Sequence, residues 1–143
     1  SVLLCTSITL IVKWLDHKSS HDQISFQTEL KPEIKLVFFH RYYYDIPFIL
    51  DRKQPTYWVE DWETVKGDNG AAQIKDGLRF EPQQSYLLWN DSDLDARIKK
   101  GEQLMILVPK HLTIEALGDL KPIRQERNFN VFLTGQPTSP VQP

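Results

Sequence analysis

Three runs of apolar, mostly strand-forming residues constrain the fold of this chain more than any other feature. They cover residues 36–39, 57–59 and 103–108 and read LVFF, YWV and QLMILV. A strand with one face in water alternates apolar and polar residues, whereas a strand covered on both faces reads as a continuous apolar run. The runs therefore predict buried strands with helices on both sides, as in an α/β fold.

The segment between the first two runs predicts a compact connection. Pro47 restricts Ile46 to extended geometry, yet proline fits the first turn of a helix. We expect a short helix from Pro47 to about Leu50, after which residues 51–53 return the chain to the second strand.

Caps and turn residues predict the other helices. Ser19 or Ser20 is expected to cap a helix that ends near residues 31–32. Asn90 or Ser92 is expected to cap another, which runs to about residue 99 and closes at Gly101. Residues 111–117 predict one more short helix, and residues 71–80 fit either a helix or an edge strand.

The C-terminal part predicts a hairpin of residues 123–127 and 129–133, with its turn at Asn128. Strands that alternate with short helices and end in a hairpin indicate a three-layer α/β/α sandwich with a small mixed sheet of about five strands. The hairpin should form one edge of that sheet. The expected core is Val37, Phe38, Phe39, Phe48, Leu50, Tyr57, Val59, Leu104, Ile106, Val108, Leu117, Val131 and Leu133.

The length of 143 residues suits a single domain with its own core. We expect residues 1–15 to be an apolar lead-in or the end of a transmembrane helix, residues 16–135 the soluble α/β domain, and residues 136–143 a flexible, proline-containing tail. The uncharged run of residues 1–12 is shorter than the roughly 20 residues of a spanning helix. It fits either the end of a longer membrane helix, with Lys13 and Trp14 at the interface, or a buried segment.

Composition excludes some classes of partner and cofactor. The chain has 17 Lys and Arg against 19 Asp and Glu, a net charge of −2, and so lacks the basic field expected of a nucleic-acid-binding protein. Cys5 is the only cysteine, which excludes an internal disulfide. His17 and His21 are four residues apart, but no third ligand is evident and a zinc site needs at least three. We expect no cofactor or metal in this domain.

The best candidate site follows the first strand. Open α/β sheets usually bind ligands at the carboxyl ends of their strands, where residues 40–44 read HRYYY. Arg41 could hold a phosphate, and tyrosines such as Tyr44 could stack on a sugar or lie at a membrane interface. Alternatively, two tyrosines pack beneath the short helix and Arg41 pairs with Asp45. Asp61, after the second strand, completes the candidate substrate-binding set of Arg41, Tyr44 and Asp61.

Other chemical signals are weaker. Carboxylates at Asp45, Asp51, Glu60, Asp61 and Glu63 could in principle act as acid and base, but carboxylates are common at turns and strand ends. Residues 90–92 fit the N-glycosylation sequon, although the helix-cap interpretation is favoured. No phosphate-binding loop or nucleophile elbow is present.

Several segments together resemble the soluble C-terminal domain of the polytopic type C glycosyltransferases. This family includes the lipid A 4-amino-4-deoxy-L-arabinose transferases and the bacterial enzymes similar to protein O-mannosyltransferases. The segments are SVLLCTSITLIV, LDHKSSHDQISFQTEL, KLVFFHRYYYDIPFILDRKQPTYWVEDW, LLWNDSDLDARIKKGEQLMILVPKHLTIEAL and NFNVFL, and the likeness departs between residues 64 and 84.

The resemblance implies the non-catalytic periplasmic domain of a bacterial inner-membrane enzyme. That enzyme would transfer a sugar from a polyprenyl-phosphate carrier to a lipid or protein acceptor, with the transmembrane domain of the same polypeptide as partner. The family's catalytic carboxylates lie on loops between transmembrane helices that this chain does not contain, so no catalytic residue is assigned. The alternatives are an autonomous α/β ligand-binding module or, less favoured, a small carboxylate-dependent hydrolase.

Overall fold

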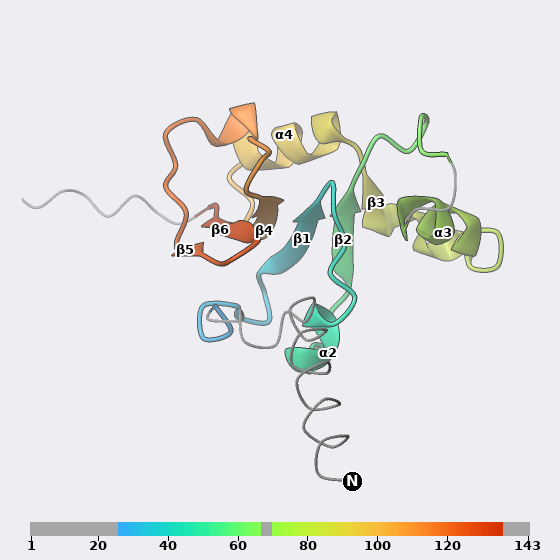
Figure 1. Ribbon diagram of the computed structural model, residues 1–143, viewed down its shortest axis with the longest axis horizontal. Helices are drawn as coiled ribbons and strands as arrows, with labels where there is room; N and C mark the ends of the chain where they lie inside the picture. The colour runs from blue at the N-terminus through green and yellow to red at the C-terminus, as the bar shows by residue number, and fades with distance from the viewer. Residues whose placement is uncertain (1–25, 67–69, 136–143) are drawn as a thin grey trace, which may run out of the picture.

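The centre of the fold is a six-stranded mixed sheet in the order β3-β2-β1-β4-β6-β5 (Figure 1). The computed structural model describes residues 26–66 and 70–135. Four neighbouring strands run parallel, and two more extend the sheet in antiparallel fashion beyond β4. The parallel strands are β1 (Lys35–Phe39), β2 (Thr56–Val59), β3 (Leu88–Trp89) and β4 (Leu104–Pro109), and the others are β5 (Arg124–Gln125) and β6 (Phe129–Leu133).

The two faces of the sheet each bury an apolar cluster, which explains the continuous apolar runs. Alternate residues of β1 divide between the clusters, with Phe38 on one face and Val37 on the other. All six residues of β4 are buried. Burial stabilises the fold by about 25 cal/mol per Å² of apolar surface, and β1 and β4 contribute residues to both clusters. The α/β fold predicted from the runs is confirmed.

Helices flank the sheet on opposite sides (Figure 1). α2 (Ile46–Ile49) contributes Ile46 to the cluster that contains Phe38. α4 (Asp91–Lys99) contributes Leu94 to the other cluster, together with Leu117 of the 3₁₀ helix η4 (Glu115–Leu117). α3 (Gly70–Gly77) and the 3₁₀ helix η3 (Pro82–Leu87) connect β2 to β3.

The sheet has one strand more than expected, because the two-residue strand β3 was not predicted. The predicted helix through residue 31 is wrong over residues 26–31, which form turns, while residues 19–25 lie outside the described part. Phe26 and Leu30 instead pack against the cluster that contains Phe38. The ambiguous residues 71–80 are mainly the helix α3, and only residues 115–117 of the predicted helix 111–117 are helical, as η4.

The predicted core is correct in its strands and wrong at Phe48. Ten of the thirteen predicted positions are buried, whereas Phe48 is 85% exposed and Leu50 and Tyr57 are half-buried. The four-residue helix α2 turns Ile46 inward, so Phe48 faces outward. The hairpin lies at the sheet edge as predicted, although its first strand is only two residues long.

The N-terminal apolar run and the C-terminal tail, residues 1–15 and 136–143, lie outside the described residues. Among the residues that the structure does describe, no helix has the length and apolar character needed to cross a membrane.

Candidate functional site

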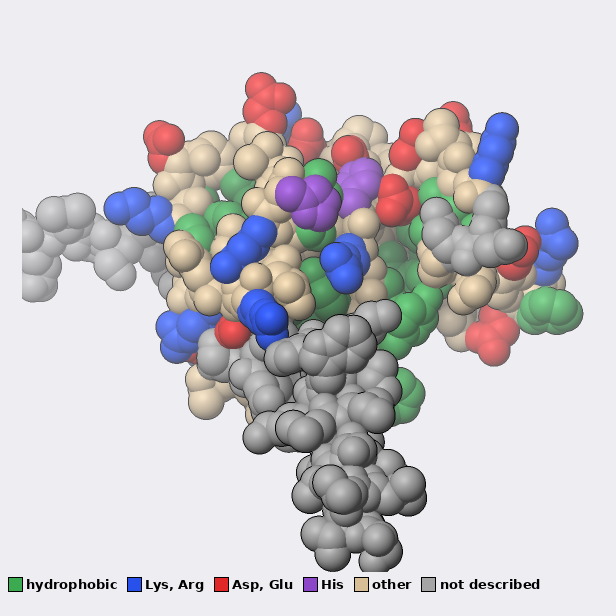
Figure 2. All heavy atoms as spheres, in the orientation of Figure 1, with side chains coloured by type: hydrophobic (Ala, Val, Ile, Leu, Met, Phe, Trp, Pro, Cys, Tyr) green, Lys and Arg blue, Asp and Glu red, His purple; other side chains and the backbone are tan. Residues whose placement is uncertain are grey.

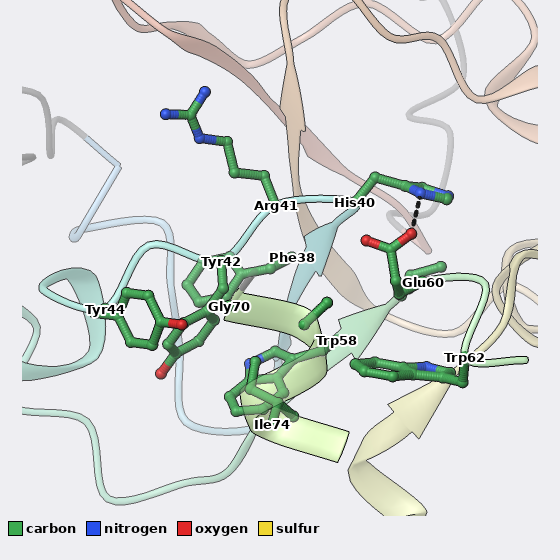
Figure 3. Close-up of a pocket in the computed structure, with 12 residues that line it drawn as sticks. Phe38, His40, Arg41, Tyr42, Tyr44, Trp58, Glu60, Trp62, Gly70 and Ile74 are labelled. Carbon is green, nitrogen blue, oxygen red and sulfur yellow. Dashed lines mark ion pairs between the residues drawn. The ribbon is translucent and has the colours of Figure 1, made fainter. Parts of the chain in front are cut away.

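A pocket of ≈ 250 Å³ opens at the carboxyl ends of β1 and β2 (Figure 3). The loop after β1, the end of β2 and the start of α3 form its walls. This is the sheet edge where α/β folds usually bind ligands. The lining residues are Phe38, His40, Arg41, Tyr42, Tyr44, Trp58, Val59, Glu60, Trp62, Gly70, Ala71 and Ile74.

Aromatic rings form most of one wall. The centre of the Tyr42 ring lies 4.4 Å from that of Trp58, 4.4 Å from that of Tyr44 and 5.1 Å from that of Phe38, all edge to face. Such pairs contribute about 0.5–1.5 kcal/mol beyond their buried area. Burial raises the pKa of the Tyr42 hydroxyl, and the neighbouring Tyr44 adds to the effect. Tyr42 therefore carries a neutral hydroxyl at pH 7.

A histidine held between two carboxylates forms the polar side of the site. His40 Nδ1 lies 2.7 Å from Glu60 Oε1, and His40 Nε2 lies 2.7 Å from Asp91 Oδ1. Both contacts are hydrogen bonds only when both ring nitrogens carry protons, as in the imidazolium ion. His40 has a positive φ of 50°, an uncommon conformation for a non-glycine residue. The three side chains tie together the ends of β1 and β2 and the start of α4.

Further hydrogen bonds fix the segments after β2 and β3. The Trp62 indole N–H donates to the carbonyl oxygen of Trp89 across 2.7 Å. Asn90 caps α4, accepting a hydrogen bond from the Asp93 backbone N–H and donating its own N–H to the Asp93 carboxylate. This reciprocal capping box confirms the cap predicted at Asn90. The segment that carries Glu60 and Trp62 and the start of α4 at Asp91 are therefore fixed by hydrogen bonds.

The structure brings two of the predicted site residues, Arg41 and Tyr44, to the pocket. The Tyr44 ring is 53% exposed. The Arg41 guanidinium points away from the pocket (Figure 3), and its carbon lies 5.6 Å from the centre of the Tyr43 ring. Arg41 thus lines the pocket without directing its charge into it.

The third predicted residue, Asp61, is exposed and lies outside the pocket lining. Its carboxylate accepts a hydrogen bond from the Thr64 hydroxyl at 2.7 Å. That hydrogen bond is the main cause of a lowered pKa for Asp61, which is therefore ionised at pH 7.

The sequence-based site did not include Trp58 or Trp62, and Glu60 was named only among the candidate acid–base carboxylates, although a signal for all three existed. Side chains alternate across a strand, so residues two apart share a face. Trp58 packs on the same face of the sheet as Phe38. If the alternation of side chains continues past the end of β2, Glu60 and Trp62 point to the same side as Trp58, whereas Asp61 does not. Glu60 and Trp62 line the pocket, as this spacing indicates.

A second hollow of ≈ 400 Å³ adjoins the first and shares Trp58 and Ile74 with it. Its other lining residues come from α3, η3 and the residues that flank them. Phe80, 88% exposed, is one of these. The shared residues make the two hollows neighbouring parts of one surface.

Histidine side chains of the described residues gather on one face of the molecule, with acidic side chains near them (Figure 2). Within residues 26–66 and 70–135, no group of three or more His, Cys, Asp and Glu side chains could hold a metal ion. The polar groups near the pocket are suited to hydrogen bonding and charge pairing.

Solved structures share this fold. The chain is similar to ArnT from Cupriavidus metallidurans in the apo state, with a TM-score of 0.56 and 20% identity over 83% of this chain. It is also similar to the same protein bound to undecaprenyl phosphate, with a TM-score of 0.54 and 19% identity. No protein-family model and no curated protein matches the sequence. The chain spans about a fifth of the ArnT chain, and at this identity the likeness concerns the fold.

Proposed function

We propose that this chain is the non-catalytic, extramembrane domain of a bacterial membrane glycosyltransferase. The whole enzyme would transfer a sugar from a polyprenyl-phosphate carrier to a lipid or protein acceptor. The domain would lie on the periplasmic side of the inner membrane, with the transmembrane domain of the same polypeptide as its partner. Its role would be to cap the membrane domain or shape the entrance for the acceptor.

The observation that carries this proposal is the likeness to ArnT, which extends over 83% of this chain but only a fifth of ArnT. One of the two ArnT structures is bound to undecaprenyl phosphate, a polyprenyl-phosphate carrier. The uncharged run of residues 1–12, immediately before Lys13 and Trp14, is the sequence expected where a membrane helix meets water. The likeness to part of ArnT and the apolar residues 1–12 at the start of this chain support the same proposal.

The polar groups of the pocket support a non-catalytic role for the domain. A histidine acts as a general base through a ring nitrogen that can accept a proton from the reacting group. Both ring nitrogens of His40 face carboxylates instead, at 2.7 Å each. The Glu60 carboxylate contacts His40 through Oε1 in the same cluster.

Reading the gene upstream of Ser1 tests the proposal directly. We expect an open reading frame that continues through many hydrophobic segments; a start codon just before Ser1 would overturn the proposal. The full-length protein, purified and placed in vesicles, should then transfer sugar from a polyprenyl-phosphate donor, while the 143-residue chain alone should not. Transfer by the 143-residue chain alone would overturn its non-catalytic assignment.

The pocket itself favours a second candidate, an autonomous ligand-binding module. Its aromatic wall and polar edge are those of a small-molecule site. The two candidates differ in what precedes Ser1, so the upstream reading frame separates them.

A further inference from the structure

We propose that the pocket between β1, β2 and α3 binds one pyranose ring of a carbohydrate. The geometry calls for a small ring with an apolar face and a hydroxyl-bearing edge, and the choice of a sugar as that ring rests on the proposed function. The ligand would lie against the aromatic wall and direct its hydroxyl groups toward Glu60.

The size of the pocket matches a single sugar. Pockets for drug-sized ligands have volumes of roughly 300–1,000 Å³. At ≈ 250 Å³, this pocket is smaller and suits one six-membered ring with its substituents. The adjoining hollow beyond Trp58 and Ile74 leaves room for a substituent or a second unit on one side.

The aromatic wall presents the surface that a pyranose recognises. One face of a pyranose consists largely of C–H groups with slight positive charge, and the face of an aromatic ring is slightly negative. Tyr44 and Trp62 both line the pocket, and Tyr44 is more than half exposed at 53%. Ile74 of α3 adds apolar surface to the lining.

The polar edge favours a neutral ligand with hydrogen-bond donors. Glu60 uses Oε1 for His40 and for the backbone N–H of Asp61, at 2.7 and 3.2 Å. The Oε2 atom takes part in neither contact, and Figure 3 shows one carboxylate oxygen directed away from His40. A carboxylate oxygen accepts hydrogen bonds from hydroxyl groups, and such charge-assisted bonds are among the stronger ones.

The charges near the pocket disfavour an anionic ligand. His40 lies between the two carboxylates of Glu60 and Asp91, so the cluster carries a net negative charge with either form of the imidazole ring. The Arg41 guanidinium points away from the pocket (Figure 3), and the Lys75 ammonium is engaged with the backbone carbonyl oxygen of Trp62. A phosphate or carboxylate would meet like charge, whereas a neutral sugar would not.

Nuclear magnetic resonance of the ¹⁵N-labelled 143-residue chain tests the proposal. The probes are the methyl pyranosides of glucose, mannose, galactose and arabinose, with cyclohexanol as an apolar six-membered ring. We expect at least one pyranoside to shift the indole N–H signals of Trp58 and Trp62, with a Kd of about 1–10 mM. Cyclohexanol should bind at least about fivefold more weakly.

Two exposed tyrosines supply a matched pair of variants. Tyr44 lines the pocket at 53% exposure, and Tyr86 lies outside its lining at 59% exposure. Tyr44→Ala should weaken pyranoside binding about fivefold to tenfold, the range expected for loss of one stacking ring, and Tyr86→Ala should leave it unchanged. Glu60→Ala should also weaken it, with the backbone spectrum showing that the fold is retained.

Three results would overturn the proposal. They are the absence of any shift with all four pyranosides up to about 100 mM, equal binding of cyclohexanol, and equal effects of the Tyr44 and Tyr86 substitutions. The upstream reading frame is an independent observation. If the upstream sequence encodes membrane segments and no pyranoside binds, the sugar site is rejected and the proposed function stands. If a pyranoside binds and no membrane segments precede Ser1, the proposed function is rejected and the sugar site stands.

Discussion

The indole N–H of Trp62 donates a hydrogen bond to the backbone carbonyl oxygen of Trp89, with 2.7 Å between the two atoms. The bond joins the segment after β2 to the end of β3 and holds the Trp62 ring at the pocket. The same carbonyl oxygen also accepts the backbone N–H of Glu60 at 3.1 Å. A side chain of the pocket and the end of the short strand β3 are therefore coupled.

We predict that Trp62→Phe lowers the free energy of unfolding by about 1 kcal/mol, because it removes the indole donor and keeps an aromatic ring. The matched control is Trp58→Phe. Trp58 Nε1 is buried and has no hydrogen-bond partner among the described residues, so its removal relieves a desolvation cost of about 1–3 kcal/mol. Urea unfolding should show the smaller loss for Trp58→Phe, and a larger loss at Trp58 than at Trp62 would contradict this account.

The capping box of Asn90 and Asp93 gives a second prediction. Asn90→Ala should lower the free energy of unfolding by about 1 kcal/mol, since it removes the acceptor for the Asp93 backbone N–H. Asn90→Asp should retain most of the stability, because aspartate is as good an N-cap as asparagine. Both changes abolish the sequon of residues 90–92, so their difference in urea unfolding reports the cap alone. Equal losses would argue against the cap.

The ion pairs of Glu102 make stability depend on pH. Burial alone would raise the pKa of Glu102, but the hydrogen bond and charge of Lys35, with those of Arg97, outweigh it and lower that pKa. Lys35 Nζ lies 2.9 Å from Glu102 Oε2, and Arg97 Nη1 lies 3.0 Å from Oε1. The folded state favours the ionised form of Glu102. The stabilisation from its ion pairs is therefore fully present above the pKa that Glu102 has in the unfolded chain. It is lost as the pH falls through the lower pKa that Glu102 has in the folded protein.

We therefore predict that Glu102→Gln costs about 1 kcal/mol at pH 7, after allowance for solvent screening of partly exposed charges. The difference from the parent protein should shrink below about pH 4.3, the ordinary pKa of glutamate, and vanish at lower pH. Urea unfolding across this pH range provides the measurement. A difference that stays constant with pH would show that packing, rather than charge, stabilises this position.

The sequence predicts the parts of the fold that depend on burial from both sides. Residues 36–39 and 104–108 are apolar throughout because each face of β1 and β4 contacts its own cluster. β3 could not be predicted in the same way, since it has two residues and follows directly on η3. Phe48 was expected in the core because phenylalanine is usually buried, but it is exposed. The four-residue helix α2 can turn only some of its side chains toward the core, and Ile46 is the one that is buried.

The position of the pocket could be read from the sequence more readily than its lining. The pocket lies at the sheet edge that follows the strand end before His40, and Tyr44 is among its lining residues. The contact of His40 with Asp91 joins residues 51 positions apart and depends on the sheet order and the start of α4. A single sequence carries no local signal for such a pairing, whereas the spacing of Trp58, Glu60 and Trp62 was available.

Gly135 and Gly101 provide the last prediction, because both have positive φ and only one is crowded. Their φ values are 69° and 73°. A Cβ on Gly135 would lie 2.6 Å from the carbonyl oxygen of Gly101 and 2.7 Å from that of Glu102, whereas a Cβ on Gly101 would meet nothing within 4 Å. Gly101→Ala should therefore cost only the left-handed backbone penalty, about 1–2 kcal/mol.

Gly135→Ala should cost that penalty and about 1–3 kcal/mol more, since the backbone of residues 101–102, just before β4, must move to accept the methyl group. Thermal unfolding of the two variants measures the difference under identical conditions. Hydrogen exchange should locate the added loss in β4 and β6, where the Thr134 backbone N–H donates to the Leu104 carbonyl oxygen at 2.9 Å. Equal melting temperatures for the two variants would contradict the close approach of residues 101–102 to Gly135.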